Sequence, residues 1–207
     1  MKLLAVVGAI VVGLALVADS VARSVAEDRI EHRALAAAGR AESADAHIRS
    51  FPFVPRLLLT GSVPRVSVRV QDVSAGPLEL AAVDLELRGV EMDRDLLLVG
   101  RAVLDDIDGG TLTLFVDPGA VARAVHLPVV VQGDTVTVTV RGRTVTARLG
   151  VSANGSLVLR VPPLPAFTVP VVRTPGLLGC ASTRAAIRDG SIVLSCELDS
   201  VPPALRR

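Results

Sequence analysis

The strict alternation of apolar and polar residues is the feature that most limits how this chain can fold. Val66, Val68 and Val70 alternate with arginine, serine and glutamine. Successive side chains of a β-strand point to opposite faces, so this period of two predicts a strand with one buried and one solvated face. The same alternation at 135–140 and 144–149 predicts an antiparallel sheet, because the strands of parallel sheets are buried on both faces.

Turn residues and a phase change give further constraints on the sheet. The segment 78–87 also alternates, but its phase slips between Leu80 and Val83, which predicts a β-bulge or a bend. Asn154-Gly155 is the strongest hairpin signal in the chain, because both residues accept the positive φ of a tight turn. Asp189-Gly190 predicts another hairpin near the C-terminus.

Helices are expected at two places. Residues 19–38 carry apolar residues roughly on one helical face. Asp117 has the character of an N-cap and Pro118 suits the first helical position, so a short helix is predicted at 119–125. We therefore expect an α+β fold, in which a strongly curved antiparallel sheet is wrapped around the N-terminal helix and short helices.

The first 18 residues have the character of a leader. One lysine is followed by 16 uncharged, mostly apolar residues before Asp19. A secretory signal has an apolar region of about 7–15 residues, and a membrane-spanning helix needs roughly 20. Two alternatives stay open: a signal peptide, with Ser20-Val21-Ala22 as a small-x-small cleavage site, or an uncleaved transmembrane anchor. Both export the chain to the periplasm or cell envelope and leave 19–207 as a single α+β domain.

The segment 50–70 connects the predicted helix to the first long strand. Phe51 and Phe53 flank Pro52, and Pro55 precedes the leucine run 57–59. We expect this leucine run to be a turn that forms a mobile lip. An apolar groove results if the helix and this turn cover only part of the apolar face of the sheet, and the alternative is an ordinary filled core.

Composition and charge argue against a nucleic-acid partner. Half of the residues are hydrophobic, yet the chain has no Trp, no Tyr and only four Phe. Its interior is therefore aliphatic, without the aromatic platforms on which single-stranded nucleic acid stacks. The net charge of +1 gives no basic footprint for a phosphate backbone.

The sequence contains none of the catalytic motifs searched for, so we expect a protein that is not an enzyme. The only lysine is Lys2, so a phosphate-binding Gly-Lys-Ser/Thr loop is absent, and neither G-x-S-x-G nor H-E-x-x-H occurs. The three histidines, His32, His47 and His126, share no ligand spacing. The acidic residues at 105–108 lack the alternation of a calcium loop and are interpreted as a solvated turn. We expect no metal and no cofactor.

The chain has two cysteines, Cys180 and Cys196, close together near the C-terminus. In an exported protein this pair suggests one disulfide across a hairpin. In a reducing compartment both are ordinary small core residues.

Several motifs together resemble the LmeA-type phospholipid-binding family of actinobacterial cell envelopes. The segments 76–90 and 110–125 contribute to the resemblance, but the pattern x-F-P-F-x-x-x-L-L-x-G-x-x-x-x-V-x-V is its most specific part. The residues that match it are Phe51, Pro52, Phe53, Leu57, Leu58, Gly61, Val66 and Val68.

This resemblance implies a fold similar to tubular lipid-binding domains, in which a curved sheet around helices leaves a channel for acyl chains. It implies non-enzymatic binding of phospholipid, with transfer as an extension, in the maintenance of envelope lipid or lipoglycan. The expected partners are a phospholipid or another acyl-chain lipid and the membrane surface. The alternative is a membrane-anchored scaffolding protein with a filled core.

The expected lipid-binding residues are aliphatic or aromatic, as smooth acyl chains require. Arg56 and Arg65 flank the apolar run and are candidates for the lipid headgroup, because guanidinium groups bind phosphate with two parallel hydrogen bonds. The predicted lining consists of Phe51, Phe53, Leu57, Leu58, Leu59, Val66, Val68, Val70, Leu85 and Leu87.

Overall fold

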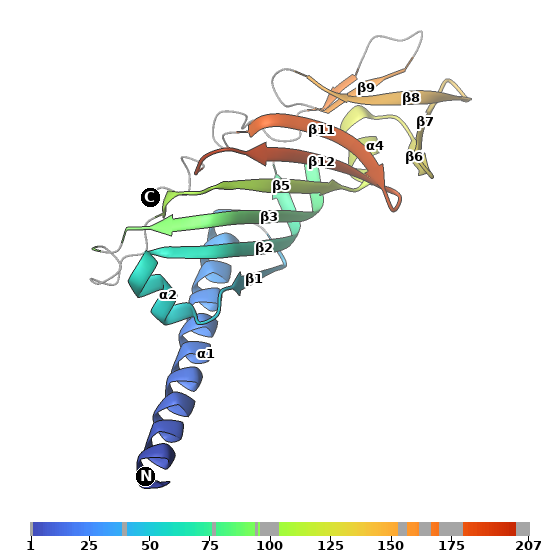
Figure 1. The fold of residues 1–207 in the computed structure, drawn as a ribbon. Coiled ribbons are helices and arrows are strands. Elements are labelled where there is room, and N and C mark those ends of the chain that lie inside the picture. The colour runs from blue at the N-terminus through green and yellow to red at the C-terminus, as the bar shows by residue number, and fades with distance from the viewer. Residues whose placement is uncertain are drawn as a thin grey trace.

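The computed structural model describes residues 2–38, 41–75, 78–93, 95, 104–152, 157–161, 167–169 and 180–201. Figure 1 shows a long N-terminal helix, α1, beside a curved array of strands. The helices are α1 (Lys2–Ala38), α2 (Phe53–Thr60) and α4 (Pro118–Val125). The strands are β1 (Ser43–Arg49), β2 (Ser62–Ala75), β3 (Leu78–Met92), β4 (Leu104–Asp106), β5 (Gly109–Val116), β6 (Val129–Gln132), β7 (Thr135–Val140), β8 (Arg143–Val151), β9 (Leu157–Arg160), β10 (Phe167–Val169), β11 (Cys180–Arg188) and β12 (Ser191–Leu198).

The strands form two antiparallel sheets. The larger follows the order β1-β2-β3-β5-β12-β11, with β4 beside β3, and the smaller follows β10-β9-β8-β7-β6. The larger sheet curves strongly, and α1 packs along β1 and β2 at one side of it (Figure 1). The predicted α+β class, with a curved antiparallel sheet around an N-terminal helix, is confirmed.

Strand alternation places one apolar row after another on the face of the larger sheet that carries α1, here called the inner face. Because each strand pairs in register with the next, alternate residues line up across the sheet. One row is Ile48, Val66 and Leu87; the next is Ala46, Val68, Leu85 and Leu112; the third is Ala44, Val70, Val83, Leu114 and Leu194. The predicted period of two in β2 is therefore present.

Three local predictions are confirmed. The β3–β5 register shifts between Leu80 and Ala82, where the phase change predicted a bulge. The Asp117 side chain accepts a hydrogen bond of 3.2 Å from the Ala120 N–H, which begins α4. Asp189 and Gly190 both adopt positive φ and connect β11 to β12. The Asn154-Gly155 signal lies outside the described residues.

The leucine run 57–59 is helical, so the prediction of a turn was wrong. Pro52 is extended at the N-cap, and Pro55 lies in the first turn of α2, where a missing N–H breaks no helical bond. Gly61 ends the helix with a φ of 69°, and its N–H donates to the Leu57 carbonyl at 2.9 Å.

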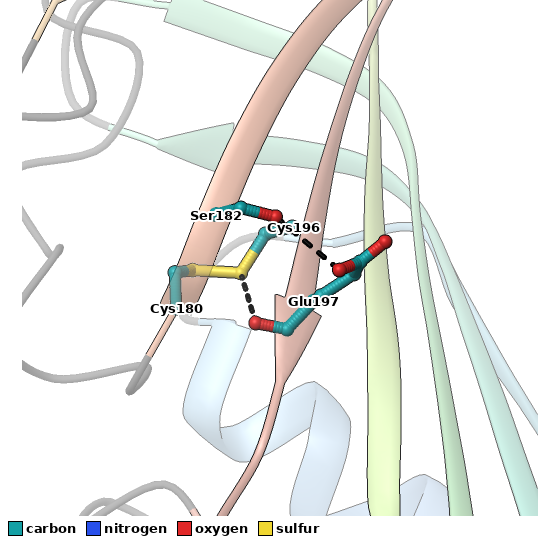
Figure 2. Close-up of a disulfide and its surroundings, with 4 residues drawn as sticks. All are labelled: Cys180, Ser182, Cys196 and Glu197. Carbon is teal, nitrogen blue, oxygen red and sulfur yellow. Dashed lines mark hydrogen bonds between the residues drawn. A yellow bond between two sulfur atoms is a disulfide. The ribbon is translucent and has the colours of Figure 1, made fainter.

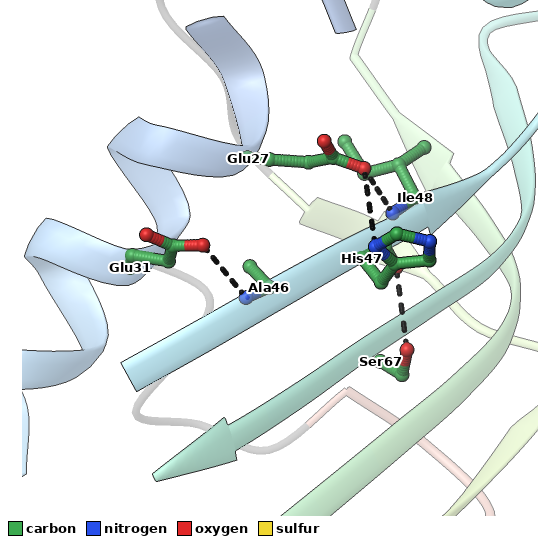
Figure 3. Close-up of polar contacts among 6 residues, drawn as sticks. All are labelled: Glu27, Glu31, Ala46, His47, Ile48 and Ser67. Carbon is green, nitrogen blue, oxygen red and sulfur yellow. Dashed lines mark hydrogen bonds and ion pairs between the residues drawn. The ribbon is translucent and has the colours of Figure 1, made fainter. Parts of the chain in front are cut away.

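The helix α1 is attached to the domain through three carboxylates. Glu27 accepts a hydrogen bond from the Ile48 N–H at 2.8 Å and Glu31 from the Ala46 N–H at 3.0 Å (Figure 3). Asp19, only 6% exposed, accepts from the Phe53 and Val54 N–H groups at 2.9 and 2.6 Å. These carboxylates therefore satisfy edge N–H groups of β1 and the first N–H groups of α2.

In the described part of the chain no helix has the length and hydropathy to cross a membrane, in contrast to the transmembrane alternative expected for residues 1–18.

Candidate functional site

Two clusters of buried apolar side chains lie against the inner face. The α2-end cluster includes Ile48, Phe53, Val66 and Leu87, and α1 residues pack against it. The far cluster lies where α4 and the smaller sheet cover β3, β5 and β12, and it includes Leu80, Val116, Val121, Val136, Leu157 and Ile192. Each end of the inner face thus has its own cover.

Between these clusters lies a patch of half-buried aliphatic side chains, here called the seam: Val68, Val83, Leu85 and Leu114. Val68, Val83 and Leu114 each pack against both clusters. The four residues are cross-strand neighbours, since Val68 pairs with Leu85 and Val83 with Leu114. The seam is therefore a continuous apolar surface that is only partly withdrawn from solvent.

The predicted lining residues divide into three groups by burial. Phe53, Val66, Val70 and Leu87 are buried in the clusters. Leu57, Val68 and Leu85 are half-buried. Phe51, Leu58 and Leu59 are exposed. Val83 and Leu114 were missed, although the alternation within 78–87 and 111–116 was the signal for them.

The two predicted headgroup arginines line one pocket of about 530 Å³ together with Arg49 and Arg88. Arg49, Arg65 and Arg88, the arginine row, are direct cross-strand neighbours on β1, β2 and β3. They point away from the inner face because they alternate with Ile48, Val66 and Leu87. Arg49 and Arg88 were missed, since their proximity depends on strand register, which the separate segments do not reveal.

The disulfide connects the last two strands. Cys180 on β11 and Cys196 on β12 are bonded, with a Cα–Cα separation of 5.6 Å (Figure 2). Cys196 belongs to the α2-end cluster, so the bond holds the edge strand β11 to this part of the core.

The remaining polar candidates are histidines and acidic residues. In the described residues, no group of three or more His, Cys, Asp and Glu side chains is placed to hold a metal. The nearest contact of His47 to a carboxylate is 3.9 Å, from its Nδ1 to Glu27 (Figure 3). Asp105 and Asp106 end strand β4, so the interpretation of 105–108 as a turn was wrong for these two residues, and Asp106 accepts a hydrogen bond from the Ile107 N–H at 2.9 Å.

These features define an α+β domain whose curved sheet presents an aliphatic, incompletely covered inner face. The family model for LmeA-like phospholipid-binding proteins matches residues 17–198, most of the chain. The chain therefore belongs to this phospholipid-binding family. No curated protein and no solved structure matches it.

Proposed function

We propose that this protein binds the acyl chains of a phospholipid along the seam of its inner face. The observation that carries the proposal is the half-burial of Val68, Val83, Leu85 and Leu114 between two fully buried clusters. Membership of a phospholipid-binding family supports the same conclusion.

The chemistry of the seam suits a hydrocarbon chain. Val and Leu side chains carry no polar atoms, so an acyl chain replaces water there without leaving a polar group unsatisfied. Removing apolar surface from water stabilises a complex by roughly 25 cal/mol per Å². Binding of this kind needs no catalytic residue, and we propose a non-enzymatic role.

We further propose that the protein acts in the cell envelope, in the maintenance of its lipid or lipoglycan, with transfer of the lipid as an extension. The apolar segment 1–18 supports export, and 19–207 is then a single lipid-binding domain. The headgroup role of Arg56 and Arg65 stays a prediction.

The test is lipid recovery from the purified full chain. Native mass spectrometry and solvent extraction should find phospholipid bound to the wild type. Leu85→Asp places a charge in the seam and should reduce the recovered lipid severalfold, while the protein stays folded by circular dichroism. Val130→Asp is the matched control, because Val130 is an exposed aliphatic residue on β6, away from the seam.

The alternative function is that of a scaffolding protein with a filled core, which the burial of Phe53, Val66 and Leu87 favours. Wild-type protein without bound phospholipid, before and after incubation with added lipid, would support this alternative and contradict lipid binding.

A further inference from the structure

The outward side of α2 is apolar and exposed. Leu58 is 56% and Leu59 75% exposed, and Phe51, just before the helix, is 71% exposed. The opposite side of α2 is anchored, because Phe53 is buried and Leu57 packs against the α2-end cluster. A short helix therefore holds two leucines and a nearby phenylalanine in water, where large apolar side chains mark an interaction surface when they gather in one place.

The arginine row lies beside this apolar surface. Like charges directly opposite each other destabilise adjacent strands, yet Arg49, Arg65 and Arg88 occupy three neighbouring strands in direct register. Among the described residues, only Arg65 of these three has an ion-pair partner, Glu86 at 3.3 Å. The repulsion indicates a surface suited to an anionic partner.

The pocket of the arginine row remains cationic when its carboxylates are included. Its lining contains the three arginines of the row and Arg56, against the two carboxylates of Glu91 and Asp108. Ser62 also lines it and can donate a hydrogen bond from its hydroxyl group. Guanidinium groups in this number fit phosphate esters better than an isolated carboxylate.

Arg56 connects the two surfaces, because it projects from α2 into the pocket. With about 3.6 residues per turn, Arg56 and Leu59 lie three positions apart and are neighbours on the same side of the helix. The apolar residues and the arginines therefore meet at one end of the domain.

We propose that this end of the domain docks on the surface of a bilayer that contains anionic phospholipids. Phe51, Leu58 and Leu59 enter the apolar layer, while Arg49, Arg56, Arg65 and Arg88 contact lipid phosphates. The inference builds on the proposed function, which requires access to a bilayer, but it concerns a different surface: the arginine row points away from the seam.

The number of arginines at the surface sets how strongly the domain should bind an anionic bilayer. Each basic residue near an anionic membrane surface contributes a factor of about five to binding. Losing two arginines should therefore weaken docking roughly 25-fold, and added salt should weaken it further because exposed charges are screened.

The experiment places a reporter on α2. Both native cysteines are in the disulfide and no described cysteine is free, so Leu59→Cys in the full chain accepts one environment-sensitive dye. Its emission should shift to the blue with phosphatidylcholine vesicles that contain phosphatidylglycerol, and much less with phosphatidylcholine alone. Val130→Cys carries the control dye on β6 and should not shift. This local readout separates contact by α2 from any contact by residues 1–18.

The arginines are tested in the Leu59→Cys background. Arg49→Gln with Arg88→Gln should raise the vesicle concentration for half-maximal shift roughly 25-fold. Arg143→Gln with Arg188→Gln removes the same charge from exposed positions outside the pocket and should change it little. Equal shifts at positions 59 and 130, no dependence on phosphatidylglycerol, or equal behaviour of the two arginine pairs would overturn the proposal.

The two proposals fail in different ways. Phospholipid recovered from the seam without a dye shift at position 59 refutes docking and leaves lipid binding in place. A dye shift without recovered phospholipid supports docking and contradicts lipid binding in the seam.

Discussion

The α2-end cluster and the seam use the same residue types on the same strands, yet one is filled core and the other is partly open. On β2, Val66 is 6% exposed, whereas Val68, two residues further on the same face, is half-buried. On β3, Leu87 is buried and Leu85 is half-buried. The difference comes from the cover above them, because α1 and α2 pack over the first row and the described helices leave the seam less covered.

This contrast shows that an aliphatic side chain on a strand becomes core or binding surface according to what packs on it. The following substitutions use matched pairs to test the contrast, in order of decreasing expected effect on stability.

Substitutions of the two phenylalanines around Pro52 should show the largest difference in the free energy of unfolding. Phe53→Ala removes a ring from the α2-end cluster and should lower the free energy of unfolding by about 3–5 kcal/mol. Phe51→Ala changes an exposed ring and should alter it by less than about 0.5 kcal/mol. Urea unfolding followed by circular dichroism measures both. Similar values for the two variants would mean that α2 does not anchor through Phe53.

Leu85 and Leu87 of β3 should show the next largest difference in the free energy of unfolding. Leu87→Ala should cost about 2–5 kcal/mol, because it leaves a cavity in a closed cluster. Leu85→Ala should cost less, roughly 1 kcal/mol, because the side chain is already partly hydrated and water fills the space. It should also weaken phospholipid binding. Equal destabilisation in urea would indicate that the seam is ordinary core.

Removing a carboxylate that attaches α1 to the domain should lower the stability by a smaller amount. Asp19→Ala leaves the Phe53 and Val54 N–H groups without their acceptor and should cost about 1–3 kcal/mol. Asp28→Ala makes the same change at an exposed position of α1 and corrects for helix propensity. Thermal unfolding of both compares them. An Asp19→Ala variant as stable as Asp28→Ala would show that the buried carboxylate does not hold α2.

The same carboxylate has a consequence for the leader. Asp19 precedes the small-x-small segment Ser20-Val21-Ala22, so cleavage after Ala22 would remove the acceptor for the first N–H groups of α2. We expect a chain that begins at Arg23 to lose about as much stability as Asp19→Ala, since both lack the same two hydrogen bonds. The mass of the mature protein shows whether cleavage occurs after Ala22. The unfolding curve of a chain that begins at Arg23 measures the loss of stability.

Local patterns predicted much of the fold correctly. The alternation of β2, the bulge after Leu80, the Asp117 cap and the Asp189-Gly190 turn each depend on a few adjacent residues, and all are present. The helix α2 was missed because Pro52 and Pro55 have the character of a loop, and the buried acceptor that supports its first turn, Asp19, is 34 residues away from Phe53.

The candidate site was also predicted only in part, because it depends on contacts between segments that are distant in the sequence. Val68 and Leu85 were identified as lining residues, but so were Phe53 and Leu87, which are core. Of the arginine row, the sequence identified Arg65 alone, because Arg49 and Arg88 join it through the pairing of β1, β2 and β3.

The amino-acid pattern thus specifies which side chains share a face, because the two-residue period of a strand is a local property. It also specifies that this face is aliphatic. Which part of the face is covered, and which arginines meet on the other side, depend on strand register and on where α1, α2 and α4 pack. Those choices are made by contacts between distant segments, so only the folded chain separates its core from its seam.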